Sequence, residues 1–157
     1  MLTAGSPCVD AATRARIDEW GSLAAGDPTV LARFIVRSMF STAFLTGLSG
    51  TQRNILLELA ELSVPQGTAE QVDLVRRIDV TGDLAAVAVP ALVIGTRLDR
   101  LVTPASMRDY ADGIPGARWA ELDSGHAVAM EAAQEWERLV AGFLAELGVA
   151  TAAAAAG

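Results

Sequence analysis

Two polar turns of the sequence contain side chains that could carry out acid–base chemistry together. Asp99 lies in the turn 95–100, and His126, the only histidine of the chain, lies in the turn 123–126. A carboxylate that accepts a hydrogen bond from an imidazole fixes the tautomer of the ring and stabilises its protonated form, so the histidine can act as a general base. Each residue alone also has a purely structural interpretation, because aspartates commonly form turns and a single histidine is often incidental. The pair matters only if the fold brings the two turns together.

The elements around these turns predict that they meet. Residues 87–95 (VAVPALVIG) form a short β-branched apolar run that is typical of a buried strand, and residues 117–122 indicate a second strand. Helices are predicted over residues 103–113, where a Thr-Pro pair marks the start, and over residues 130–147. This order of strand, helix, strand and helix predicts a right-handed unit with parallel strands. Loops at the carboxyl ends of neighbouring parallel strands lie side by side, which would place the two polar turns next to each other.

The first half of the chain has the pattern of amphipathic helices joined by short turns. Apolar side chains recur at helical spacing, and Gly, Pro, Asp or Ser residues mark the ends of each run. The predicted helices cover residues 10–25, 28–46, 51–64 and 68–78. The first few residues are predicted to be the end of a strand that runs into a loop. The last residues are low-complexity alanine, for which no packed structure is expected.

Composition excludes several classes of function. The chain has 157 residues and a net charge of −7, from 19 acidic residues against 12 basic residues that are all arginine. An acidic chain without a run of basic residues repels a phosphate backbone, so nucleic acid is not an expected partner. The lone Cys8 excludes an internal disulfide and a cysteine-based metal site, and it fits a reducing compartment. No apolar run reaches the roughly 18 residues of a membrane span, and no secretory signal is visible. We therefore expect a cytoplasmic protein without a membrane partner.

Residues 89–144 resemble the C-terminal part of an α/β-hydrolase. In the order of that family, the sequence has an apolar strand with a Pro near its start, a Gly and then Asp99 in the next loop, and an Ile-Pro-Gly-Ala turn after the following helix. A strand, the pair Gly125-His126 and a last helix opened by Glu131 come next. One departure is that Ala133 stands where the family often has Pro.

The resemblance implies a role for each of the two polar residues and a fold for the chain. Asp99 would be the acid of a catalytic triad and His126 its base, with no metal ion and no organic cofactor. The fold class would be α/β, a partial α/β-hydrolase sheet of two to three parallel strands with a helical cap region. The expected divisions are a remnant strand and loop over residues 1–7, a helical cap over 8–86, the C-terminal core segment over 87–148 and an alanine-rich tail over 149–157.

The nucleophile of the family has no counterpart in this sequence. In the family a serine sits in a Gly-x-Ser-x-Gly elbow between a strand and a helix. The nearest match is the stretch 47–51, but its second glycine comes one place early and the stretch lies between two predicted helices. Ser49 is therefore better explained as part of a turn that ends a helix. Cys8 does not lie in such an elbow either.

Two functions are consistent with an acid–base pair that has no nucleophile in the same sequence. In the first, the chain is the C-terminal portion of a hydrolase that cleaves an ester, thioester, lactone, amide or similar bond in a small to medium apolar substrate by a Ser-His-Asp mechanism. The nucleophile would come from a missing or separate N-terminal half that packs on the open edge of the sheet, and the chain alone would be inactive. Some relatives use a nucleophilic aspartate on epoxides or halides.

In the alternative, the chain is a catalytically inactive hydrolase remnant that acts as a binding or oligomerisation module through the same edge. A wrongly chosen start of the coding sequence is a third explanation of the length.

Overall fold

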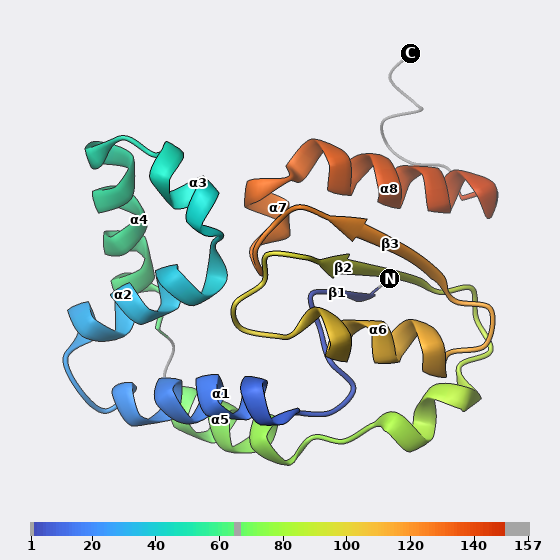
Figure 1. Ribbon diagram of the computed structural model, residues 1–157, viewed down its shortest axis with the longest axis horizontal. Coiled ribbons are helices and arrows are strands. Elements are labelled where there is room, and N and C mark those ends of the chain that lie inside the picture. The colour runs from blue at the N-terminus through green and yellow to red at the C-terminus, as the bar shows by residue number, and fades with distance from the viewer. Residues whose placement is uncertain (1, 65–66, 150–157) are drawn as a thin grey trace.

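The computed structural model describes residues 2–64 and 67–149. A three-stranded parallel sheet has helices on both faces, and further helices lie beside the carboxyl ends of its strands (Figure 1). Apart from its first residue, the predicted alanine-rich tail falls outside the described residues. Within the described ranges, no helix is long and apolar enough to cross a membrane.

The sheet has the order β1 (Leu2–Thr3), β2 (Leu92–Thr96) and β3 (Arg118–Leu122), and both neighbouring pairs are parallel. The central strand β2 is buried along its whole length, which suits its apolar sequence LVIGT. Thr96 is level with Leu122 in the ladder, so β2 and β3 end together and the loops that follow them begin side by side. The predicted α/β architecture with two to three parallel strands is confirmed.

Helices cover both faces of the sheet. α8 (Ala133–Glu146) lies on one face, where Phe143 packs in a buried cluster with Leu92. α6 (Pro104–Gly113) lies on the opposite face (Figure 1), and its Met107 is almost completely buried. Burial of each large apolar side chain of this kind contributes roughly 2 kcal/mol to the stability of the fold. The two layers of helix therefore fix the positions of β2 and β3.

The other helices form the region that the sequence predicts to be helical. Asp10, Asp27, Ser41 and Ser49 each begin one of them, and each side chain accepts a hydrogen bond from a backbone N–H of the first turn. Figure 1 shows α2, α3 and α4 beside the carboxyl ends of the strands, with α1 and α5 packed together below the sheet. The bounds are α1 (Ala11–Leu23), α2 (Pro28–Met39), α3 (Thr42–Gly47), α4 (Gly50–Leu62), α5 (Thr68–Arg77) and a short 3₁₀ helix η1 (Thr81–Ala86).

The predicted helix over residues 28–46 is wrong, because the structure has two helices there. At Phe40 the backbone is extended, with φ −115° and ψ 146°, and Ser41 then caps α3. The amide of Ser41 donates to the carboxylate of Glu131 at 2.6 Å instead of to a helical carbonyl. The predicted closing helix is also divided, into α7 (Val128–Glu131) and α8.

The predicted strand over residues 87–95 is wrong at its start, because β2 begins at Leu92. Pro90 has no N–H to donate to a neighbouring strand, so the ladder starts only after it. Val89 is 67% exposed and belongs to the loop that follows η1. The second strand begins at Arg118, one residue later than predicted, and Arg118 donates its N–H to the carbonyl of Ala91 at 2.9 Å.

Asp10 links the first helix to the sheet layer. One carboxylate oxygen caps α1 by accepting the N–H of Thr13 at 2.7 Å. The other accepts the hydroxyls of Thr103 at 2.5 Å and Ser106 at 2.6 Å, in the first turn of α6. Partial burial would raise the pKa of Asp10, but the hydrogen bonds from Ser106, Thr103 and Thr13 outweigh it and hold the pKa well below its ordinary value of 3.8. A single carboxylate thus serves two helix N-termini.

We expect Asp10→Asn to lower the free energy of unfolding at pH 7 by about 1–3 kcal/mol, because an amide cannot accept all of these hydrogen bonds as well as a carboxylate. A group whose pKa is depressed by folding stabilises the native state above its unfolded pKa and loses that effect as the pH falls through the folded value. The difference between wild type and variant should therefore shrink below about pH 4 in urea unfolding curves. Asp27→Asn is the matched control, because Asp27 caps α2 from an exposed position, and we expect it to cost less than half as much. Equal losses in the two variants would contradict the link to α6.

Candidate active site

The two predicted polar turns lie side by side at the carboxyl ends of β2 and β3. The N–H of Arg97 donates to the carbonyl of Leu122 at 3.0 Å, and the N–H of Leu98 donates to the carbonyl of Ser124 at 3.0 Å. On the exposed side, the guanidinium of Arg97 pairs with the carboxylate of Asp123 at 2.6 Å. These contacts extend the parallel pairing past the ends of the strands and hold the two loops in a fixed relation.

The side chain of Asp99, in the loop after β2, is completely buried. One carboxylate oxygen accepts the N–H groups of Leu101 at 2.7 Å and Val102 at 2.9 Å. The other accepts the hydroxyl of Thr96 at 3.1 Å and also contacts His126. A carboxylate with four donors around it has no freedom to rotate away, so its position is set by the backbone of its own loop.

His126 lies next to Asp99, and the distance from its Nδ1 to the Asp99 carboxylate is 2.9 Å. An ionised carboxylate can only accept, so Nδ1 must carry the proton and a neutral ring keeps Nε2 as an acceptor. The imidazole side chain is 23% exposed. No hydrogen bond to Nε2 occurs within the described part of the chain. The structure therefore brings the two residues predicted from the sequence into one hydrogen-bonded pair, in which Nε2 has no hydrogen-bond partner among the described residues.

Contacts from the helical region fix the turn that carries His126. The N–H of Ala127 donates to the carbonyl of Met39 at 2.9 Å, and the amide of Ser41 donates to Glu131. A Cβ on Gly125 would lie 2.7 Å from the backbone nitrogen of Ser41 and 2.9 Å from the carbonyl oxygen of Met39. Only glycine allows this close approach. The roles of Ser41 and Met39 were not predicted, because they lie far from His126 in the sequence.

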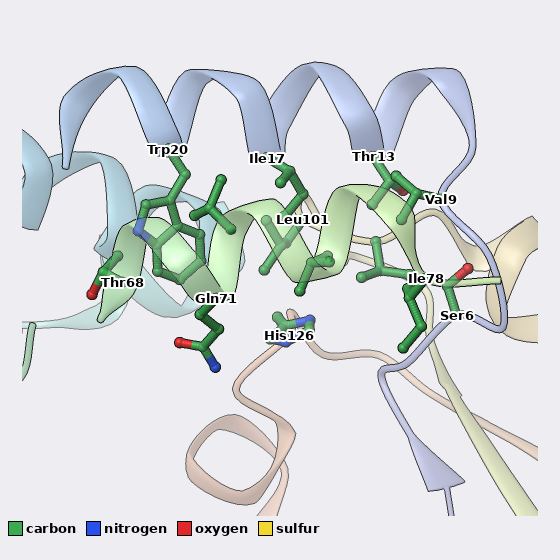
Figure 2. Close-up of a pocket in the computed structure, with 13 residues that line it drawn as sticks. Ser6, Val9, Thr13, Ile17, Trp20, Thr68, Gln71, Ile78, Leu101 and His126 are labelled. Carbon is green, nitrogen blue, oxygen red and sulfur yellow. The ribbon is translucent and has the colours of Figure 1, made fainter. Parts of the chain in front are cut away.

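An apolar cavity of about 250 Å³ lies against His126, between α1 and α5. Figure 2 shows His126 on one side of it, with Ile17 and Trp20 of α1 on the other. Apart from His126, the lining contains no ionisable side chain, and only a few polar side chains such as Gln71. A charged group placed there would lose its hydration without gaining an opposite charge. The cavity is therefore suited to an uncharged, mostly apolar group.

A second hollow, of about 380 Å³, lies on another side of His126. Thr3 and Ala4 at the end of β1 line it together with Met130 and Trp136. β1 is an outer strand of the described sheet, so its far edge carries no neighbouring strand there. His126 thus stands between an apolar cavity formed by helices and a hollow at the open end of the sheet.

Comparison with solved structures decides the fold. The chain superposes with a TM-score of 0.80 and 19% identity on an α/β-hydrolase enzyme from a deep-sea metagenome library of the Medee basin. The match covers 91% of this chain and 54% of that one. The enol-lactonase of Burkholderia xenovorans LB400 gives a TM-score of 0.74, with 22% identity over 91% of this chain and 54% of the lactonase. This chain has part of the α/β-hydrolase fold.

Sequence comparison points to the same group of proteins. The chain is 30% identical over 137 residues to a pyrrolizixenacetamide deacetylase from Xenorhabdus hominickii, a match that covers 86% of this chain and 51% of the deacetylase. The chain thus spans about half the length of the proteins it matches. No family model matches it. Its likeness to hydrolases is therefore shown at the level of the fold.

Ser49 and Cys8 are the two other residues that the sequence analysis compared with the nucleophile of the family. Ser49 caps α4, where its hydroxyl accepts the N–H of Gln52 and the Gln52 side chain accepts the N–H of Ser49. α3 ends at Gly47 and this capping box begins α4, so Ser49 lies at the predicted break between two helices. Cys8 forms an isolated antiparallel β-bridge with Asp79 through the backbone, and its thiol is free. Burial, followed by the charge of Asp79, raises the pKa of that thiol. Within the described ranges, no group of three or more potential ligands could hold a metal ion.

Proposed function

We propose that this chain supplies the acid and the base of a hydrolase that follows a Ser-His-Asp mechanism, with the nucleophile on a segment outside this sequence. The observation that carries the proposal is the hydrogen bond between Nδ1 of His126 and Asp99, which leaves Nε2 without a partner among the described residues while His126 lines an apolar cavity. The names of the related proteins, an enol-lactonase and a deacetylase, support acyl-group chemistry.

In the proposed mechanism each of the two residues has one role. Nε2 of His126 takes the proton of the serine hydroxyl as its oxygen attacks the carbonyl carbon of the substrate. The resulting imidazolium then gives that proton to the leaving group, which departs as an alcohol or amine. Water repeats the sequence on the acyl-enzyme and releases the acid. Asp99 stays ionised throughout and stabilises the imidazolium through Nδ1.

The open edge of β1 is where we place the nucleophile-bearing segment. A further parallel strand could pair with Leu2 and Thr3 there, and the turn after that strand would reach the hollow lined by Thr3, Ala4 and His126. Unpaired strand edges readily accept another strand. This placement puts a side chain from the partner segment on one side of the imidazole and the substrate on the other.

The cavity against His126 suits the acyl or leaving group of the substrate. A cavity of about 150 Å³ can enclose benzene, so one of about 250 Å³ has room for a ring with a short substituent or for a medium-length acyl chain. The absence of ionisable groups other than His126 from its lining favours an uncharged substrate.

Complementation tests the proposal. The half of the Xenorhabdus deacetylase that the match leaves out can be fused in front of this chain, and hydrolysis of p-nitrophenyl butyrate measured for the fusion and for the chain alone. We expect activity only in the fusion, and a loss of about a thousandfold or more in kcat with His126→Ala. Activity of the fusion that survives His126→Ala would contradict the proposal. A folded but inactive fusion would favour a hydrolase remnant that acts as a binding module.

A further inference from the structure

We propose that a second site, the groove between α2, α3 and α4, binds a small organic phosphate that carries an apolar group. The groove has a volume of about 490 Å³. Arg33 and Arg37 of α2, Arg53 of α4 and Arg100 of the loop after β2 all line it. It shares no lining residue with the cavity against His126, so this inference does not depend on the proposed function.

The arginines of the groove have no acidic partners within the described residues. The lining contains no aspartate or glutamate. Arg37 donates to the carbonyl of Arg33 at 3.3 Å, and Arg100 donates to the hydroxyl of Thr42 at 3.4 Å. Arg53 likewise donates only to backbone carbonyls. Five other arginines of the same chain do form ion pairs with carboxylates: Arg76, Arg77, Arg97, Arg108 and Arg118.

This arrangement is unfavourable for the protein alone. Four positive charges around one hollow repel one another, although water screens the repulsion because all four residues are exposed. A multiply charged anion would remove the repulsion. Guanidinium groups present paired N–H donors that match the oxygens of a phosphate, and the hydrogen bonds are strengthened by the opposite charges. A phosphate uses several arginines at once, whereas one carboxylate is satisfied by a single arginine.

The rest of the groove indicates the other part of the ligand. Its remaining lining is largely apolar and includes Val30, Val36, Leu45 and Leu57. Such a surface adds affinity for a hydrocarbon group next to the phosphate. The groove is a hollow with a defined volume, which fits a small molecule. Its bound anion would also tie the helices α2 and α4 to the loop of Arg100, the residue that directly follows Asp99.

Calorimetric titration of the chain with hexyl phosphate tests the site, with inorganic phosphate and hexanol as comparison ligands. We expect saturable binding of one hexyl phosphate, tighter than either comparison ligand. Arg33→Gln combined with Arg37→Gln should weaken it by about tenfold or more, since each removes a charge-assisted contact. The control combines Arg14→Gln with Arg138→Gln, two exposed arginines outside the groove, and should change the affinity by less than about twofold.

Protection of arginines from a chemical reagent tests the same site on the wild-type chain. Phenylglyoxal modifies accessible arginines, and mass spectrometry reports each site. Saturating hexyl phosphate should protect Arg33, Arg37 and Arg100 while leaving Arg14 and Arg138 reactive. This readout decides the question even if the double variant of the groove fails to fold. No saturable binding, equal weakening in the two double variants, or uniform reactivity of all arginines would overturn the proposal.

Discussion

Replacing Asp99 with alanine is expected to lower the free energy of unfolding by about 3–5 kcal/mol. The change leaves two backbone N–H groups, of Leu101 and Val102, and the hydroxyl of Thr96 without their acceptor. The carboxylate side chain itself has no exposed area, so water cannot replace it without opening the loop. Urea unfolding followed by tryptophan fluorescence measures the effect.

The matched control for this change is Asp123→Ala in the neighbouring loop. Asp123 is paired with Arg97 as Asp99 is with His126, but the side chains of Asp123 and Arg97 are 66% and 54% exposed. Exposed ion pairs contribute little because water screens them, and we expect a loss below about 1 kcal/mol. A similar loss in both variants would mean that Asp99 is not the buried acceptor that holds this loop. Its hydrogen bonds would then not fix its position beside His126.

Gly125→Ala is expected to lower the free energy of unfolding by about 2–3 kcal/mol. The added methyl would lie 2.6 Å from the carboxylate of Glu131 and within 3 Å of two backbone atoms, at Ser41 and Met39. Backbone atoms cannot move aside as a flexible side chain can, so the turn of His126 must separate from the junction of α2 and α3. In the complemented fusion, the same variant should lower kcat because His126 shifts with the turn.

The control for this prediction is Gly142→Ala in α8. Apart from the backbone of α8 itself, no atom of the described residues lies within 4 Å of a Cβ at Gly142, and alanine favours a helix over glycine by about 1 kcal/mol. We therefore expect Gly142→Ala to be neutral or slightly stabilising in the same unfolding measurement. If Gly125→Ala were equally harmless, the close contact between the turn of His126 and the helical region would not exist in solution.

Local patterns in the sequence were sufficient to place Asp99 next to His126. Each residue lies in the turn that follows a strand, and the parallel order of the strands makes the loops after them neighbours. Helix starts were also predictable where a capping side chain lies in the same turn, as with Asp27 and Ser49. In both cases the determining contacts are close in sequence or follow from a rule of chain topology.

Contacts between distant segments account for what the sequence did not predict. The break between α2 and α3 depends on the bond from Ser41 to Glu131, which is 90 residues away. The sequence does not predict the groove with four arginines for the same reason. Arg33, Arg53 and Arg100 are scattered along the chain, and only the packing of α2 and α4 against the loop after β2 gathers them. The sequence has no basic run, but its fold has a basic site.

The tautomer of His126 tests the central claim most directly, and the chain offers a clear view of it because His126 is its only histidine. A long-range proton–nitrogen NMR correlation on the untagged chain, at a pH where the ring is neutral, shows which ring nitrogen carries the proton. We expect the proton on Nδ1, held by Asp99, with Nε2 unprotonated and ready to act as a base. In Asp99→Asn this preference should be lost. A neutral ring with its proton on Nε2, or a tautomer that Asp99→Asn leaves unchanged, would contradict the account of Asp99 and His126 as an acid–base pair.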